Sequence, residues 1–203
     1  PVWKSAVPDG DIADYASIMS VGDGPQKQYV QFLRKGLVGV RASDGEFLWR
    51  YDATADQGAN ILTPVVQRNL VFSAGSRTGG GLVKLEPTSD GASATQVYFD
   101  RKLGSSIGGA VLIDGHLFGS TSSAMYCADF ETGEVKWQER VVGNASICYA
   151  DGRLYMRGHD NADVVLIDPS PEGLREISRF TQLHRSEVRA WPHPVVANGG
   201  FYL

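Results

Sequence analysis

The feature that most constrains the fold of this chain is a degenerate repeat of roughly 40 residues. Its clearest copy, CADFETGEVKW, runs from Cys127 to Trp137, and an earlier copy, GVRASDGEFLW, runs from Gly39 to Trp49. The turn glycines of the repeat fall at positions 45, 91, 133 and 173, so successive copies lie 46, 42 and 40 residues apart. A period of this size is typical of propeller blades and solenoids. The repeat therefore predicts a modular architecture and says little about chemistry.

Short apolar runs between the turns predict strands. The chain contains 24 glycines, mostly at turns, and four segments are typical of tight hairpins: 64–72, 110–118, 147–155 and 194–202. Asp-Gly or Asn-Gly at the centre of three of them favours type I′ turns, in which both central residues need positive φ. Each hairpin is followed by an apolar strand, a glycine turn and an outer strand. Two hairpins in series make one four-stranded antiparallel blade.

Two short segments are open to more than one interpretation. Residues 171–180 could begin a helix, but we expect a strand because Gly173 stands where the other repeats turn. The triple glycine at 79–81 resembles a phosphate-binding loop, yet no Lys-Ser or Lys-Thr pair follows it. We expect that triplet to form a flexible turn.

The register of the repeats predicts an all-β propeller with one partial propeller domain over residues 1–203. Four of its blades are expected at about 14–52, 58–100, 105–141 and 145–182, with half-blades at 1–10 and 190–203. In the first half-blade, Pro1–Lys4 would form an outer strand. A piece of four blades with a half-blade at each end cannot close its own ring, and it would leave apolar faces and strand edges exposed. We therefore expect about four blades of a total of seven or eight, in a longer chain or in a half-ring that a second copy completes.

Composition narrows the classes of function. The chain is 42% hydrophobic and 21% charged, which is ordinary for a folded protein, and its net charge is −4. Basic residues are scattered, so we expect no nucleic-acid surface. No apolar run of about 18 residues is present, which predicts no membrane insertion. No signal peptide opens this sequence.

The best copy of the repeat has a spacing that a structural turn explains. Gly133 would take the positive-φ position, and the Asp129 side chain would accept backbone N–H groups across the turn near Thr132. Trp137, four residues after the glycine, would lie flat between blades and bury a large apolar surface. Gly45 and Trp49 repeat the same offset, whereas Thr95 and Ile177 replace the tryptophan in the other two copies.

This pattern resembles the tryptophan-docking motif of the PQQ-like β-propeller repeat proteins. The resemblance extends over nearly the whole chain and is strongest to secreted bacterial members of the planctomycete type. It implies an extracytoplasmic location and a noncatalytic propeller that acts as a protein-binding or scaffold module, as in the propeller lipoprotein of the outer-membrane assembly machinery. The partner that the resemblance implies is a protein, and no cofactor is expected.

Two other functions remain open. The chain could be a sensor or accessory domain of a larger secreted or membrane-anchored protein. It could also be part of a quinone (PQQ)-dependent oxidoreductase, although the enzymes that this fold resembles use adjacent cysteines and a calcium set. Cys127 and Cys148 are far apart in sequence and both lie in apolar runs, so we expect buried free thiols, with a disulfide or a metal site as alternatives.

Few residues stand out as binding candidates. His159, Asp160 and Asp163 form a polar cluster that could hold a cation through oxygen ligands, but we expect a solvated hairpin there. Trp191 lies beside a polar loop and is the candidate for an interaction surface. His193, between two prolines, is expected to shape the start of the next strand.

Overall fold

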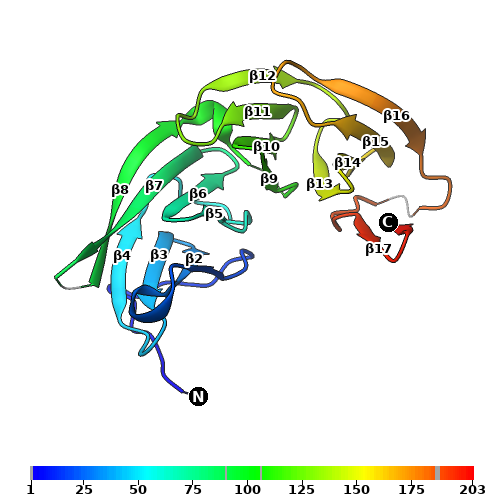
Figure 1. Cartoon of the computed structure of the whole chain (residues 1–203). Coiled ribbons are helices and arrows are strands. Elements are labelled where there is room, and N and C mark those ends of the chain that lie inside the picture. Colours follow the sequence, from blue (N-terminus) through cyan, green and yellow to red (C-terminus); the bar gives the residue numbers. More distant parts are fainter. Residues whose placement is uncertain (1, 90, 106, 186–187) are drawn as a thin grey trace. The chain divides into compact units, whose positions relative to one another are not determined.

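The computed structural model describes residues 2–89, 91–105, 107–185 and 188–203. It contains four antiparallel sheets of four strands each and one two-stranded sheet (Figure 1). In every four-stranded sheet the strands follow one another in chain order, because each is joined to the next by a hairpin turn. The chain divides into two compact units, Pro1–Gly104 and Ser105–Leu203. The expected all-β class and the four-stranded antiparallel sheets are confirmed.

The first unit contains two of the four-stranded sheets. The first sheet comprises β1 (Met19–Val21), β2 (Gln28–Leu33), β3 (Gly36–Arg41) and β4 (Phe47–Tyr51), with the short 3₁₀ helix η1 (Gly24–Gln26) between β1 and β2. The second comprises β5 (Val65–Gln67), β6 (Leu70–Gly75), β7 (Gly79–Thr88) and β8 (Gly91–Asp100), and the 3₁₀ helix η2 (Arg101–Leu103) follows it. Apolar side chains of both sheets share one core cluster, in which Phe32 and Trp49 meet Val71 and Val83.

The second unit repeats this arrangement. Its first sheet comprises β9 (Ala110–Ile113), β10 (His116–Ser120), β11 (Met125–Asp129) and β12 (Val135–Glu139). Its second comprises β13 (Ala145–Ala150), β14 (Arg153–Gly158), β15 (Asp163–Asp168) and β16 (Arg175–Thr181), followed by the hairpin of β17 (Val195–Ala197) and β18 (Gly200–Tyr202). Phe118 and Met125 pack with Ile147 and Met156 in the shared core.

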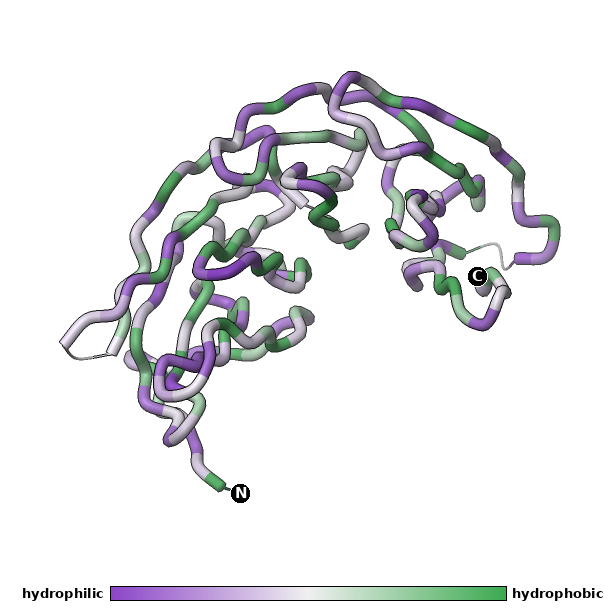
Figure 2. The backbone as a smooth tube through the Cα atoms, in the orientation of Figure 1, coloured by the Kyte–Doolittle hydropathy of each residue, from purple (hydrophilic) through white to green (hydrophobic). Residues whose placement is uncertain are grey.

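The tight turns have the expected geometry. Both central residues have positive φ in the Asp114-Gly115, Asp151-Gly152 and Asn198-Gly199 turns, as a type I′ turn requires. The strand expected near residue 177 is also present, as β16. Figure 2 shows hydrophobic and hydrophilic residues alternating along β16, and all seven of its residues are exposed.

Two expectations about local structure are wrong. The triple glycine at 79–81 is no turn: it begins β7, paired with β6 on one side and β8 on the other. A Cβ at Gly80 would overlap Phe72, and one at Gly81 would overlap the Tyr51 hydroxyl, so glycine allows the backbones to approach closely there. The second is the outer strand expected at the start of the chain: residues 2–12 contain no strand, and no strand of a sheet pairs with them.

Candidate interaction surface

The repeat motif is a hydrogen-bonded turn. The Asp129 carboxylate accepts the backbone N–H groups of Glu131 and Thr132 at 3.1 and 2.8 Å and the Thr132 hydroxyl at 2.8 Å. Gly133 has a φ of 76°, which a side chain would strain. Burial alone would raise the pKa of Asp129, but these hydrogen bonds outweigh it and lower the pKa below its usual value. The residues therefore act together to hold the turn between β11 and β12.

The earlier copy of the motif reaches the same turn with different side chains. Gly45 again has a φ near that of Gly133, at 77°. Asp44 accepts the backbone N–H of Glu46 at 3.0 Å, and this bond, with the neighbouring Arg41, lowers the pKa of Asp44. Arg41, which stands in the place of Asp129, forms ion pairs with Asp44 and Glu46.

The motif tryptophans pack within and between sheets. Trp137 lies against the core of the second unit, and its indole Nε1 donates to the Ser170 carbonyl of the neighbouring sheet at 2.8 Å. Trp49 is 5% exposed, and its Nε1 donates to Gln28 Oε1 at 2.7 Å within its own sheet. Both indoles therefore satisfy their N–H groups; Trp49 is buried, whereas Trp137 is half-buried.

Trp3 occupies a position that the sequence reading did not assign to the motif. Its Nε1 donates to the Ala42 carbonyl at 3.2 Å, and its ring closes over Gly45 so tightly that a Cβ there would overlap it. The ring also lies 6.2 Å from that of Tyr29. Trp3 precedes Trp49 by 46 residues, the same step that separates Gly45 from the next turn glycine. That spacing was the signal that could have identified it.

Trp191 lies on a loop that spans residues 182–194, of which 186–187 fall outside the described residues. Its side chain is 55% exposed, while its backbone carbonyl accepts the Ser146 hydroxyl at 3.1 Å. His193 lies at the surface, with Nδ1 3.0 Å from the Ile147 carbonyl and Nε2 3.3 Å from the Ile107 carbonyl. The loop therefore presents an aromatic ring to solvent from a fixed backbone.

The solvated position expected for His159 is wrong. The residue is 2% exposed, and its Nε2 lies 2.8 Å from the Ser146 hydroxyl. Because that hydroxyl donates to Trp191, we assign the proton to His159 Nε2, which donates to Ser146. His159 Nδ1 is buried with no hydrogen-bond partner among the described residues. Burial lowers the pKa of His159 to about 4, so the ring is neutral near pH 7.

The two carboxylates of the proposed cation cluster do not converge on this histidine. Asp160 pairs with Arg189 at 2.7 Å, and Asp163 accepts the Thr181 hydroxyl at 2.6 Å and lies 3.4 Å from Arg179. Within the described part of the chain, no group of three or more His, Cys, Asp or Glu side chains is placed to hold a metal ion. Asp160, in the loop after β14, and Asp163, the first residue of β15, thus face arginines.

A buried arginine completes the anchoring of the Trp191 loop. Arg157 is 5% exposed and donates to the Ala190 carbonyl at 3.2 Å and to Gln182 Oε1 at 3.0 Å. The backbone N–H of Ala190 in turn donates to the His159 carbonyl at 3.2 Å. Polar groups on β13 and β14 thus fix the loop on both sides of the exposed indole.

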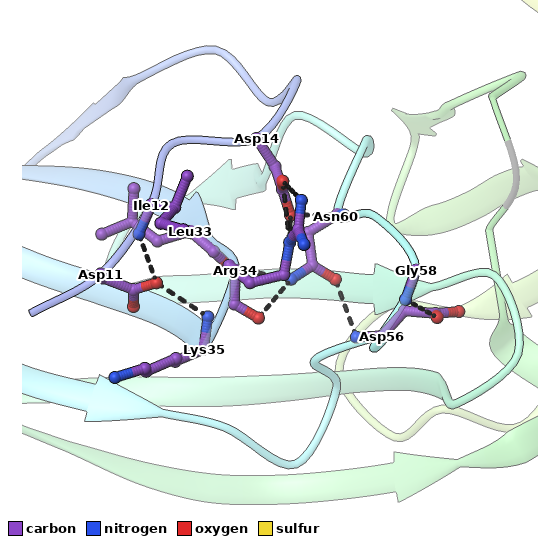
Figure 3. A network of polar contacts seen from close by, with 9 residues as sticks. All are labelled: Asp11, Ile12, Asp14, Leu33, Arg34, Lys35, Asp56, Gly58 and Asn60. Atoms are coloured by element: carbon purple, nitrogen blue, oxygen red, sulfur yellow. Dashed lines mark hydrogen bonds and ion pairs between the residues drawn. The ribbon is translucent and has the colours of Figure 1, made fainter.

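A second polar network lies at one end of the sheets of the first unit (Figure 3). Asp14 is bidentate to Arg34, with Oδ2 2.8 Å from Nε, and also accepts the backbone N–H of Asn60 at 3.0 Å. Asn60 donates through Nδ2 to the Leu33 carbonyl at 2.7 Å, and its Oδ1 accepts the backbone N–H of Asp56 at 2.8 Å. The bonds join the loops at 11–15 and 52–64 to the turn after β2.

The arginine side chains of this network are exposed to solvent. The side chains of Asp14 and Asp56 are 1% and 3% exposed, whereas those of their partners Arg34 and Arg77 are 39% and 72% exposed. The hydrogen bonds from Arg34 lower the pKa of Asp14. For Asp56, burial opposes and the bonds from Arg77 favour the charged form, with a net lowering of the pKa. This end of the first unit therefore carries guanidinium groups held in place by buried carboxylates.

The cysteines take part in neither surface. Both are free thiols; Cys127 is buried, as expected, but Cys148 is only half-buried because it lies on the inner edge strand β13. Burial raises the pKa of the Cys127 thiol to about 12, which keeps it protonated.

Four-stranded antiparallel sheets in chain order, docked tryptophans and a 40-residue repeat together define a β-propeller. A comparison of the sequence with models of protein families supports this class and identifies one family within it. Residues 3–139 match the family described as outer membrane protein assembly factor BamB, and the chain belongs to that family.

Comparison with solved structures gives the same fold. BamB from Moraxella catarrhalis matches with a TM-score of 0.64 and 16% sequence identity, over 96% of this chain and 56% of that chain. The N-terminal domain of Nup159 matches with a TM-score of 0.54 and 11% identity, over 85% of this chain and 46% of that domain. The chain thus spans about half the length of the structures it matches. At these identities the likeness shows the fold alone.

No curated protein matched the sequence. Within the described residues, no helix is both long enough and apolar enough to cross a membrane.

Proposed function

We propose that this chain is a noncatalytic propeller that binds a protein partner as a scaffold outside the cytoplasm. The observation that carries the proposal is the exposed Trp191 ring on a loop whose backbone is held by Ser146, Arg157 and His159. Tryptophan is enriched among the residues that dominate binding energy at protein interfaces. A side chain whose backbone is already fixed loses less freedom on binding, which favours affinity. The family assignment, to an assembly factor, supports the same function and the extracytoplasmic location.

The test is capture of partners on immobilised protein from an envelope extract of the organism that encodes the chain. We expect a saturable partner that is lost by at least tenfold with Trp191→Ala, as for an interface residue worth about 1.4 kcal/mol or more. The control is Tyr15→Ala, which removes another exposed aromatic side chain, 75% exposed, from the first unit. Equal capture by all three proteins would refute the role of Trp191.

If the chain were part of a quinone-dependent oxidoreductase, it would show activity in an oxidation assay. The purified chain would be mixed with pyrroloquinoline quinone and Ca²⁺ and assayed for dye-linked oxidation of alcohols. We expect no turnover above that of free quinone, and reproducible turnover would replace the scaffold proposal with the enzyme. If the protein responds to a small ligand without holding a partner, the role of sensor or accessory domain would be favoured.

We also propose that copies of this chain self-associate to complete a ring. The support is β16, whose seven residues are all exposed and include Ile177 and Phe180 at 48% and 50% exposure. Exposed apolar side chains on an edge strand such as β16 are surfaces that proteins normally cover. Light scattering should give twice the chain mass, and Phe180→Lys should return the protein to the monomer. A monomer at all soluble concentrations would contradict this arrangement.

A further inference from the structure

The first unit contains a groove that lies apart from the Trp191 surface and includes Arg41 and Leu48 of the earlier copy of the repeat motif. Its volume is about 410 Å³, which lies within the range of about 300–1,000 Å³ that is usual for ligand sites. Its walls are the loop between β1 and β2, the turn between β5 and β6, and the far end of the β7–β8 hairpin. The lining residues used below are Lys27, Arg41, Leu48, Arg68 and Glu86.

One wall of the groove is an unusual hairpin. β7 and β8 have ten residues each, whereas the outer strand pairs of the other three four-stranded sheets have strands of five to seven residues. The hairpin therefore extends beyond the sheet it belongs to, as β7 and β8 do in Figure 1. Leu48 packs so closely under Gly91 that a Cβ there would fall 2.6 Å from Leu48 Cδ2. The base of the groove is thus apolar and firmly packed.

Arg68 projects from the opposite wall under backbone strain. It has a φ of 55° in the two-residue turn between β5 and β6, although a side chain with a Cβ is disfavoured in this region. The corresponding turns of the second unit carry Asp-Gly or Asn-Gly, which accept positive φ easily. Arg68 forms no ion pair among the described residues. Strain of this kind is concentrated at functional positions.

Only some of the charged side chains around the groove have a partner of opposite charge. Arg41 is paired with Asp44 and Glu46, and Glu86 is paired with Lys84 at 2.7 Å. Lys27 contacts the face of the Tyr29 ring, 5.7 Å from its centroid, and has no carboxylate partner among the described residues. Two cations, Lys27 and Arg68, therefore line the groove without a counter-charge of their own. Of the acidic residues in the lining, Asp23 alone lacks a cationic partner within the described part of the chain.

We propose that this groove binds an extended acidic peptide segment of a partner protein. A carboxylate of the peptide would lie between Arg68 and Lys27, since guanidinium and ammonium groups form strong charge-assisted hydrogen bonds with carboxylates. An apolar side chain of the peptide would lie on Leu48, which is partly buried at the base of the groove. The inference rests on the proposed protein-binding function and identifies a second contact, distinct from Trp191, together with its chemistry.

The test is fluorescence anisotropy with a labelled nine-residue peptide of alternating Val and Glu, with a Val and Lys peptide of equal length as the charge control. We expect saturable binding of the acidic peptide that weakens as salt is raised, and none of the basic one. Arg68→Asn should weaken binding about tenfold or more, as loss of a hydrogen bond to a charged group does. Because asparagine accepts positive φ, the same variant should keep or raise the thermal midpoint, so lost binding would not reflect unfolding.

Two further variants make the result decisive. Arg101→Gln removes an exposed arginine outside the groove, in η2 of the same unit, and should leave binding unchanged. Trp191→Ala should also leave peptide binding unchanged, so failure of the scaffold proposal and failure of the groove are distinguishable. Equal binding of the two peptides, unchanged affinity in Arg68→Asn, or no saturation at millimolar protein would overturn the proposal.

Discussion

Removing the Trp49 indole tests whether the docked tryptophans hold the sheets of the first unit. Trp49 is 5% exposed, packs with Val71 and Val83 of the next sheet, and donates to Gln28 Oε1. Truncation of a buried Trp to Ala costs about 3–5 kcal/mol, and we expect Trp49→Ala to lower the free energy of unfolding by about 4 kcal/mol. Trp49→Phe keeps much of the ring but leaves the buried Gln28 oxygen unpaired, which costs about 2 kcal/mol.

Urea unfolding followed by circular dichroism measures both values, because the far-ultraviolet signal of the strands survives loss of a tryptophan. Trp191→Ala is the matched control, since the same residue type is there 55% exposed and should change stability by less than about 0.5 kcal/mol. A Trp49→Ala cost below about 1 kcal/mol, or one equal to that of Trp191→Ala, would refute the reasoning.

Three other results are expected. Gly119→Ala should destabilise the second unit by about 2 kcal/mol or more, because its Cβ would overlap the buried Tyr126 ring, and thermal melting measures the loss. The pKa of His159 is about 4 in the folded protein, whereas the same residue titrates near 6.5 in the unfolded chain. This difference leaves the free energy of unfolding unchanged above pH 6.5 and lowers it by about 3 kcal/mol as the pH falls towards 4. The melting temperature of His159→Gln should fall less over that range, and an equally steep fall would contradict the burial of the histidine. Native protein should react with a thiol reagent at Cys148 well before Cys127, whose raised pKa and burial protect it, and peptide mapping of the labelled protein identifies which reacted first.

The strands and turns of this chain could be predicted from its sequence because they depend on residues close together in it. Asp114-Gly115 accepts positive φ wherever it occurs, so the hairpin around it follows from two residues and their apolar flanks. The hydrogen bonds of Asp129 likewise remain within the motif. The flexible turn predicted for the triple glycine at 79–81 was wrong because the need for glycine there comes from Phe72 and Tyr51, which other strands supply.

The candidate surfaces could be anticipated only in part. The aromatic character and polar surroundings of Trp191 pointed to an exposed ring, but its fixation depends on Ser146, 45 residues earlier. His159 was taken for a solvated residue because its neighbours in sequence are polar; in the fold it lies beneath the Trp191 loop, whose residues exclude water from it. The groove depends on loops and a hairpin tip drawn from residues 21–91, and no local pattern marks it.

The sequence by itself determined the all-β class, the period of the blades and the geometry of their turns, because backbone conformation responds to nearest neighbours and to the positions of glycine. The tertiary structure decided which side chains are buried, which charges are paired and where Trp3 docks. These properties depend on residues brought together from distant parts of the chain, and the free energy of burial and of pairing belongs to those contacts and to no single segment.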